Sequence, residues 1–138
     1  MKKLVIVLIA AVGVILYSAS ALILFTSNKN SRYTVYTDGF CSEEYSLDAF
    51  AAYKACLFES EKGLSVKPDA DFDCEKFIKT VSAEKIFTEN CEGIELTYYR
   101  SPFIKNYITL KNERINLEIA KKPNGEIIIG TPIILGSI

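Results

Sequence analysis

The feature that most constrains this chain is an uninterrupted apolar segment, Leu4–Phe25, close to its N-terminus. The segment contains no charged residue and no proline. As a continuous helix it would extend about 33 Å, enough to cross the hydrocarbon core of a bilayer, which is about 30 Å thick. We therefore predict a transmembrane helix, which would make a membrane a partner of this chain through residues 4–25.

The same segment also has features of a cleavable signal peptide. Lys2 and Lys3 precede it, and Ala19–Ala21 offers small residues suited to cleavage. However, the apolar run continues beyond that site to Phe25, and it is longer than the apolar region of a usual signal peptide. These observations favour an uncleaved signal anchor over residues 1–25, with a secreted form released by cleavage as the alternative.

The rest of the chain divides into a short polar stalk and one domain. Residues 26–32 are rich in serine and asparagine, and residues 33–138 have the size of a single small domain. The domain has 17 acidic and 12 basic residues, with 14 acids against 6 bases in 38–95 and 3 against 6 in 96–138. This acidic front half argues against nucleic acid, or anionic lipid, as the main partner of the domain.

All four cysteines, Cys41, Cys56, Cys74 and Cys91, lie in this domain. An even count behind a signal anchor is typical of two disulfides, and it favours an extracytoplasmic domain on a single-pass protein of the cell membrane. The alternatives are a zinc site, which usually has a closely spaced cysteine pair that is missing here, and four reduced thiols in a cytoplasmic domain.

The pairing of the cysteines can be narrowed by distance. A helix over about 44–60 would separate Cys41 from Cys56 by about 18 Å. A disulfide needs Cα atoms within about 7 Å of each other. We therefore expect the pairs Cys56–Cys74 and Cys41–Cys91.

Periodicity and turn residues predict the elements of the domain. Helical patterns cover 45–61 and 74–81, a loop is expected over 64–70, and strand patterns cover 32–37, 85–89, 93–100, 106–111, 114–120 and 126–130. In the segment 114–120, the apolar Ile115, Leu117 and Ile119 alternate with Asn116 and Glu118. Such alternation is typical of an antiparallel sheet with one covered face, so the predicted fold class is α+β, with about five strands covered by one or two helices.

Four acids alternate along the segment Asp69–Glu75, as in the first half of a calcium-binding loop. An EF-hand starting at Asp69 would need glycine at its sixth position and glutamate at its twelfth, where this chain has Cys74 and Thr80. We therefore predict no metal site here, and we expect an aspartate to cap the helix that follows. We also expect no cofactor, because the sequence has no phosphate-binding glycine loop.

Three segments of the last third, Tyr98–Pro102, Ile108–Ala120 and Ile129–Ile134, resemble the C-terminal portion of the YwmB family. This family consists of small bacterial extracytoplasmic proteins described as having a fold like that of the TATA-box-binding protein. The resemblance implies that the antiparallel sheet is curved and packed by helices. It implies neither DNA binding nor any catalytic residue.

The chain has no histidine, which excludes histidine-dependent nucleophiles and histidine-ligated metal sites. We therefore expect a non-enzymatic binding domain at the cell envelope, with another envelope protein or a cell-wall component as partner and with no nucleic-acid partner. Its candidate interaction surface is Tyr98, Tyr99 and Arg100, because tyrosine and arginine are enriched in interface hot spots. The alternatives are a hydrolase of envelope glycans that uses two carboxylates, or a secreted factor.

Overall fold

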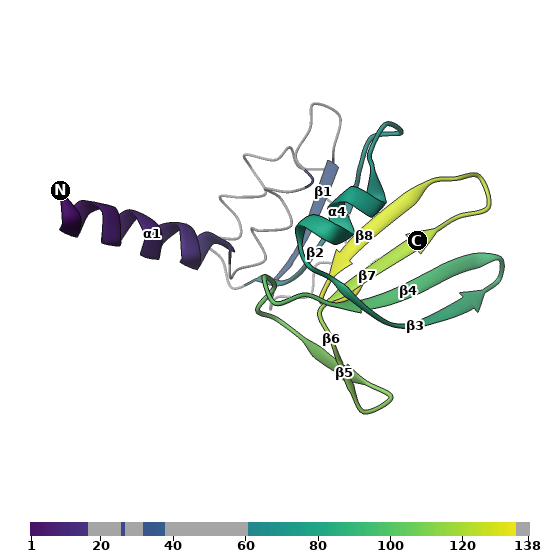
Figure 1. The fold of residues 1–138 in the computed structure, drawn as a ribbon. Helices are drawn as coiled ribbons and strands as arrows, with labels where there is room; N and C mark the ends of the chain where they lie inside the picture. Colours follow the sequence, from purple (N-terminus) through teal and green to yellow (C-terminus); the bar gives the residue numbers. More distant parts are fainter. Residues whose placement is uncertain (17–25, 27–31, 38–60, 135–138) are drawn as a thin grey trace.

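The computed structural model describes residues 1–16, 26, 32–37 and 61–134. In chain order its elements are α1 (Lys2–Leu16), β1 (Arg32–Thr37), β2 (Glu61–Lys67), α4 (Cys74–Thr80), β3 (Glu84–Cys91), β4 (Ile94–Arg100), β5 (Ile108–Leu110), β6 (Glu113–Ile115), β7 (Leu117–Lys121) and β8 (Ile127–Thr131). Figure 1 shows α1 extending away from a sheet, with α4 lying against that sheet.

Six of the described strands form one antiparallel sheet in the order β1-β2-β8-β7-β4-β3. Tight turns join β3 to β4 and β7 to β8. In the first turn, Glu92 and Gly93 both have positive φ angles, 52° and 85°, as a two-residue hairpin turn requires. β5 and β6 form a separate two-stranded sheet, which Figure 1 shows projecting beside the main one.

The core lies between α4 and one face of the main sheet. Asp73 caps α4, since its carboxylate accepts a hydrogen bond from the backbone N–H of Lys76 at 3.0 Å. The helix then directs Phe77 and the following Val81 onto the sheet. The buried side chains of this cluster are Tyr33, Leu64, Val66, Cys74, Phe77, Val81, Tyr99, Ile104, Leu117, Ile119 and Ile129. Each large apolar side chain buried in this way stabilises the fold by about 1.5–3 kcal/mol.

The expected strand over 114–120 is two strands in the structure. β6 ends at Ile115, β7 begins at Leu117, and Asn116 between them is where the chain passes from the small sheet to the large one. The alternation between Ile115, Leu117 and Ile119 continues across this break, so periodicity gave no sign of it. Asn116 and Glu118 are also buried, at 5% and 4% exposed, so both faces of β7 are covered.

The prediction of a transmembrane helix is wrong for the described residues, among which no helix has the length and apolar character that crossing a membrane requires. α1 contains 15 residues and therefore extends about 22 Å, short of the bilayer core of about 30 Å. Residues 17–25 of the predicted helix lie outside the described part of the chain.

The predicted fold class is also wrong. In place of about five strands covered by helices behind a transmembrane segment, the described residues form mostly sheet, six strands and a further two, with two short helices. One cause is β2, whose residues were expected to be a helix end and a loop. Leu64, Ser65 and Val66 pair with both β1 and β8, and this pairing overrides their weak local pattern. The predicted helix over 45–61 lies outside the described residues except for Glu61, which begins β2.

The prediction of disulfides is wrong for the two cysteines that the structure describes, because Cys74 and Cys91 are both free thiols. Cys74 lies in the core with Tyr99, whereas Cys91 is exposed at the end of β3, on the side of Tyr98. Adjacent residues of a strand point to opposite faces, so the sheet separates the two sulfur atoms. Cys41 and Cys56, the predicted partners, lie outside the described residues.

Candidate functional site

Two of the three residues predicted to form an interaction surface are buried. Tyr98 and Tyr99 are 8% and 9% exposed, on opposite faces of β4. Tyr99 belongs to the core under α4, and the ring of Tyr98 packs against that of Phe87 with centroids 4.5 Å apart. Burial raises the pKa of Tyr98 to about 12, and the carboxylates of Glu118 and Glu89 add to this shift. Of the three residues, Arg100 is the most exposed, since 42% of its side chain is accessible to solvent.

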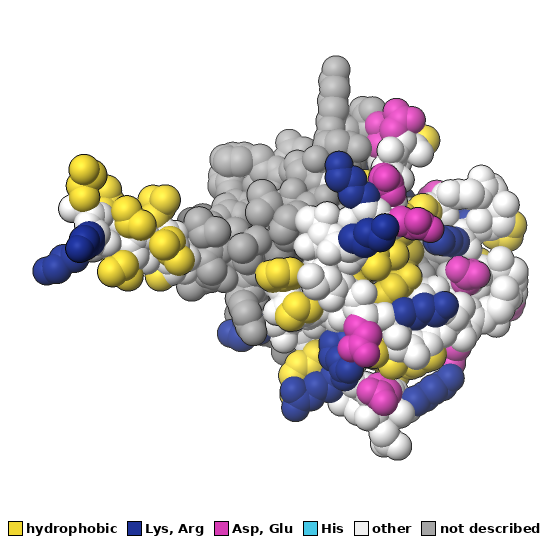
Figure 2. Space-filling model, viewed as in Figure 1, with side chains coloured by type: hydrophobic (Ala, Val, Ile, Leu, Met, Phe, Trp, Pro, Cys, Tyr) yellow, Lys and Arg dark blue, Asp and Glu magenta, His cyan; other side chains and the backbone are white. Residues whose placement is uncertain are grey.

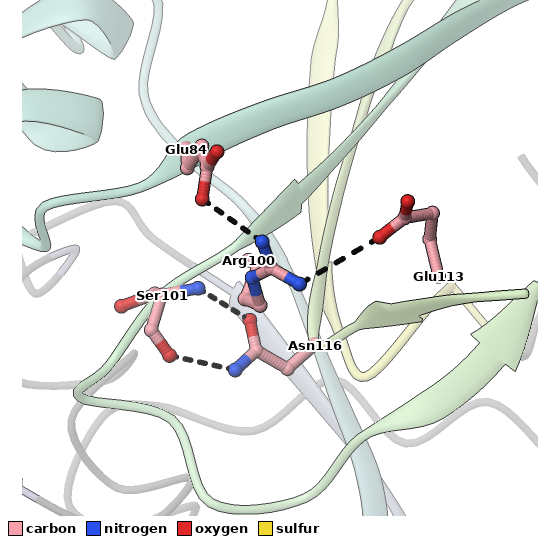
Figure 3. Close-up of polar contacts among 5 residues, drawn as sticks. All are labelled: Glu84, Arg100, Ser101, Glu113 and Asn116. Carbon is pink, nitrogen blue, oxygen red and sulfur yellow. Dashed lines mark hydrogen bonds and ion pairs between the residues drawn. The ribbon is translucent and has the colours of Figure 1, made fainter.

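Arg100 ends β4 and connects the main sheet to the small one. One of its terminal nitrogens lies 3.1 Å from a carboxylate oxygen of Glu84 on β3, and the other lies 3.7 Å from Glu113 on β6 (Figure 3). All three side chains are more than 40% exposed, so solvent screens these ion pairs. Their contribution to stability is therefore small, at most about 1 kcal/mol each.

The loop that follows β4 is held by a buried polar brace. The Asn116 amide group donates to the carbonyl oxygen of Ser101 at 2.7 Å, and its own oxygen accepts the Ser101 N–H at 2.7 Å (Figure 3). The same amide group also donates to the carbonyl oxygen of Ile104 at 2.8 Å. The Ser101 hydroxyl donates to the carbonyl oxygen of Val81 at 2.6 Å. A buried polar network whose members are all hydrogen-bonded fixes a unique backbone path. The Asn116 amide and the Ser101 hydroxyl therefore make the loop 101–107 leave the sheet in a defined direction.

This loop and the β5–β6 hairpin present an exposed aromatic side chain beneath a cation. Tyr107 is 51% exposed, and the guanidinium carbon of Arg114 lies 4.4 Å from the centre of its ring. At this distance the cation is attracted to the face of the ring. Lys105, in the same loop, is exposed as well. We call Lys105, Tyr107 and Arg114 the hairpin patch.

Sequence reasoning missed the hairpin patch because it placed Tyr107 within an ordinary strand. A signal was present: along 107–111 the residues alternate, and Tyr107, Thr109 and Lys111 are all on the exposed side. Figure 2 shows lysine and arginine side chains near hydrophobic ones over the part of the molecule where Figure 1 draws β5 and β6.

Glu118 on β7 pairs with Tyr98 on β4, on the side of Tyr98 opposite to Phe87, and its side chain is buried. It accepts a hydrogen bond from the backbone N–H of Ile134 at 2.7 Å, and so holds the segment after β8 against the sheet. Burial raises the pKa of Glu118, the hydrogen bond from Ile134 lowers it, and the carboxylate of Glu89 raises it further. Gly130 allows this arrangement, because a Cβ there would lie 2.6 Å from the Ile134 side chain.

A cleft of about 320 Å³ lies between the loop before α4 and the β7–β8 turn, lined in part by Asp69, Phe72, Asn124 and Glu126. The turn is fixed by the Asn124 side-chain oxygen, which accepts the Glu126 N–H at 3.0 Å. The Glu126 carboxylate forms an ion pair with Lys122 at 3.4 Å. The cleft thus combines an aromatic ring with two carboxylates and an amide, which are groups that can bind a polar organic molecule.

The described residues of the cleft and of the hairpin patch do not form a metal site. Among the residues that the structure describes, no three cysteine or acidic side chains come close enough together to hold a metal ion. The four alternating acids do not converge: Asp69 lines the cleft, and Asp73 caps α4.

The first residues of the chain form the largest exposed apolar surface in the described structure. Every side chain from Leu4 to Ile9 is between 53% and 68% exposed. Lys2 and Lys3 precede these residues, and no charged residue follows them within α1. An apolar helix exposed around its circumference has no stable place in water, so this segment needs an apolar partner.

Comparisons with protein-family models, with curated proteins and with solved structures find no match to this chain. The resemblance to the YwmB family therefore stays a prediction from the three segments in the last third of the sequence.

Proposed function

We propose that this protein is a non-enzymatic binding protein that α1 attaches to a lipid membrane, with the sheet domain at the membrane surface. The observation that carries the proposal is the exposure of the side chains of Leu4–Ile9 on a helix without internal charge. Each methylene group that moves from water into lipid contributes about 0.8 kcal/mol of favourable free energy. Lipid is therefore a favourable environment for such a helix. Lys2 and Lys3 suit the headgroup layer at its start.

The proposal is tested by flotation of the full-length chain with phosphatidylcholine vesicles. We expect the wild-type chain to float with the vesicles, and the double variant Ile6→Glu/Ile9→Glu to stay at the bottom of the gradient. Each charge within a lipid-buried helix costs roughly 2.5–3.5 kcal/mol, enough to abolish attachment. Lys85→Glu, at an exposed position on β3, changes the net charge by the same two units outside α1, so it is the matched control and should float. Flotation of the double variant as efficient as that of the wild type would refute the proposal.

The side of the membrane on which the domain lies is a separate matter. Free thiols at Cys74 and Cys91 remove the disulfide argument for an extracytoplasmic domain. Support now comes only from Lys2 and Lys3 before the apolar segment, an order of residues with which exported chains begin. We keep the extracytoplasmic location as part of the proposal on this ground.

Cys91 provides a reporter of this location because its thiol is exposed. A membrane-impermeant maleimide applied to intact cells should label a chain in which Cys41 and Cys56 are replaced by serine. The further variant Cys91→Ser should lose most of that label, since Cys74 is buried. Labelling of Cys91 only after the cells are lysed would place the domain inside.

A second candidate function is the hydrolysis of envelope glycans. The observation that favours it is the cleft, because its lining includes two carboxylates, Asp69 and Glu126, and glycosidases act with a pair of carboxylates. Release of reducing sugars from cell-wall glycans by the purified chain, and its loss in both Asp69→Asn and Glu126→Gln, would establish this activity over simple binding. If the wild-type chain releases no sugar, this candidate is removed.

A further inference from the structure

Apart from Met1 and α1, the described part of the chain has one large apolar side chain that is more than half exposed, and it is Tyr107. A tyrosine has an apolar ring and a polar hydroxyl, and such side chains are enriched at the boundary between lipid and water. The most exposed large apolar side chains of the described residues therefore belong to an N-terminal helix suited to hydrocarbon and to a tyrosine suited to the headgroup layer.

The charges around Tyr107 are not neutralised by nearby acids. Arg114 contacts the ring of Tyr107 and Lys105 lies two residues before it, and neither forms an ion pair with a carboxylate within the described residues. The acids of this region are already engaged: Glu113 pairs with Arg100, and Glu89 pairs with Lys111. The hairpin patch is thus locally cationic.

The chain as a whole has a formal net charge of −1, which alone would not favour an anionic surface. Salt screens charge interactions beyond about 8 Å at physiological ionic strength, so the local charge of the patch decides what it attracts. The front half, where acids exceed bases, contributes no residue to the patch.

The patch is also held in place. The Asn116 brace fixes the start of the loop 101–107, and hydrogen-bonded pairing between Ile108 and Ile115 fixes the base of the hairpin. Near the hairpin turn, the Lys111 ammonium group lies 4.5 Å from the centre of the Phe87 ring on β3. A rigid support reduces the entropy that a surface loses on binding.

We propose that the hairpin patch is a second membrane contact, in which Arg114 and Lys105 bind the phosphates of anionic lipids and Tyr107 enters the headgroup layer. This inference rests on the proposed attachment of α1 to lipid and assigns the domain an orientation on the membrane. A weak apolar anchor combined with a basic patch gives more stable attachment than either element alone. The lipid class is therefore anionic phospholipid.

The test is hydrogen exchange of the full-length chain on vesicles of phosphatidylcholine, with or without phosphatidylglycerol. On the anionic vesicles, exchange of residues 101–115 should slow relative to the neutral vesicles. The variant Lys105→Gln/Arg114→Gln should lose this protection, and its apparent affinity for anionic vesicles at low salt should fall roughly 10- to 30-fold. Lys76→Gln/Lys79→Gln on α4 removes the same charge from exposed positions outside the patch, and it should behave as the wild type.

The outcomes separate this inference from the proposed function. If the chain binds neither vesicle, the attachment of α1 fails and the inference fails with it. If the chain binds both vesicles and residues 101–115 exchange equally on each, the attachment stands and the anionic contact is overturned. Protection of the same residues in lipid-free solution that grows with protein concentration would assign the patch to a second copy of this chain, and would also overturn it.

Discussion

The β5–β6 hairpin and the main sheet differ in how they are held. In the sheet, Leu117, Ile119 and Ile129 are at most 1% exposed and pack against α4. The hairpin has a single fully buried side chain, Ile115, and depends on the polar brace of Asn116 and on exposed ion pairs. Stability therefore resides in the sheet, while the hairpin is a supported surface whose outer residues can change at little cost to folding.

The largest effect is expected from Ile119→Ala in the sheet. It removes a fully buried side chain and leaves a cavity, so the free energy of unfolding should fall by about 2–5 kcal/mol. Chemical denaturation of the full-length chain in mild detergent measures this. Thr109→Ala on the hairpin should change stability by less than about 0.5 kcal/mol. Equal losses for the two variants would remove the distinction between sheet and hairpin.

The next largest effect is expected from Asn116→Ala, where the two regions meet. The substitution leaves the carbonyl oxygens of Ser101 and Ile104 and the N–H of Ser101 without this partner, at a cost of about 1–3 kcal/mol. Hydrogen exchange should become faster in 101–107 and change little in β7. Unchanged exchange in the loop would show that the brace does not determine its path.

Glu118→Gln tests the buried charge of the main sheet. A glutamine keeps an oxygen for the Ile134 N–H and removes the charge, so we expect stability at pH 7 to rise, on the order of 1 kcal/mol. Burial raises the pKa of Glu118, so the folded chain binds more protons than the unfolded one. The wild type should therefore lose stability as the pH rises from the unfolded pKa through the folded one, and the variant should lose less.

Thermal denaturation over that pH range distinguishes the outcomes for Glu118. A variant less stable than the wild type at pH 7 would mean that the charged hydrogen bond to Ile134 outweighs the cost of burial. The ionised carboxylate of Glu118 would then be a stabilising group of the main sheet.

The smallest effect is expected from Arg100→Gln. Its ion pairs with Glu84 and Glu113 are exposed, so the loss should be about 0.5 kcal/mol and should disappear in high salt. Thermal denaturation with and without added salt measures this. A loss as large as that of Asn116→Ala would show that the ion pairs, rather than the brace, connect the hairpin to the sheet.

The same contrast explains how much the sequence could predict. β1, α4 with its Asp73 cap, the hairpin β3–β4 and β8 lie within a few residues of the predicted segments, because each has a local pattern bounded by a turn. β2 was missed because Leu64–Val66 are held by pairing with distant strands. The break at Asn116 was missed because it depends on carbonyl groups 12 and 15 residues earlier in the chain.

The candidate site was only partly predictable for the same reason. The sequence identified Arg100 but paired it with two tyrosines that the sheet buries. The contact between Arg114 and Tyr107 forms only when β5 and β6 pair, and their composition resembles that of any exposed strand. The exposed apolar residues of α1, in contrast, follow from composition alone.

The attachment of α1 to lipid is tested most directly by comparing hydrogen exchange of the full-length chain in lipid-free buffer and on phosphatidylcholine vesicles. Amides of 4–9 should exchange slowly only when vesicles are present, because the proposed attachment buries α1 in lipid. Amides of Leu117–Lys121 should be protected equally in both conditions, because the sheet is folded without lipid. Equal exchange of 4–9 with and without vesicles, while the sheet stays protected, would contradict the attachment of α1 to lipid.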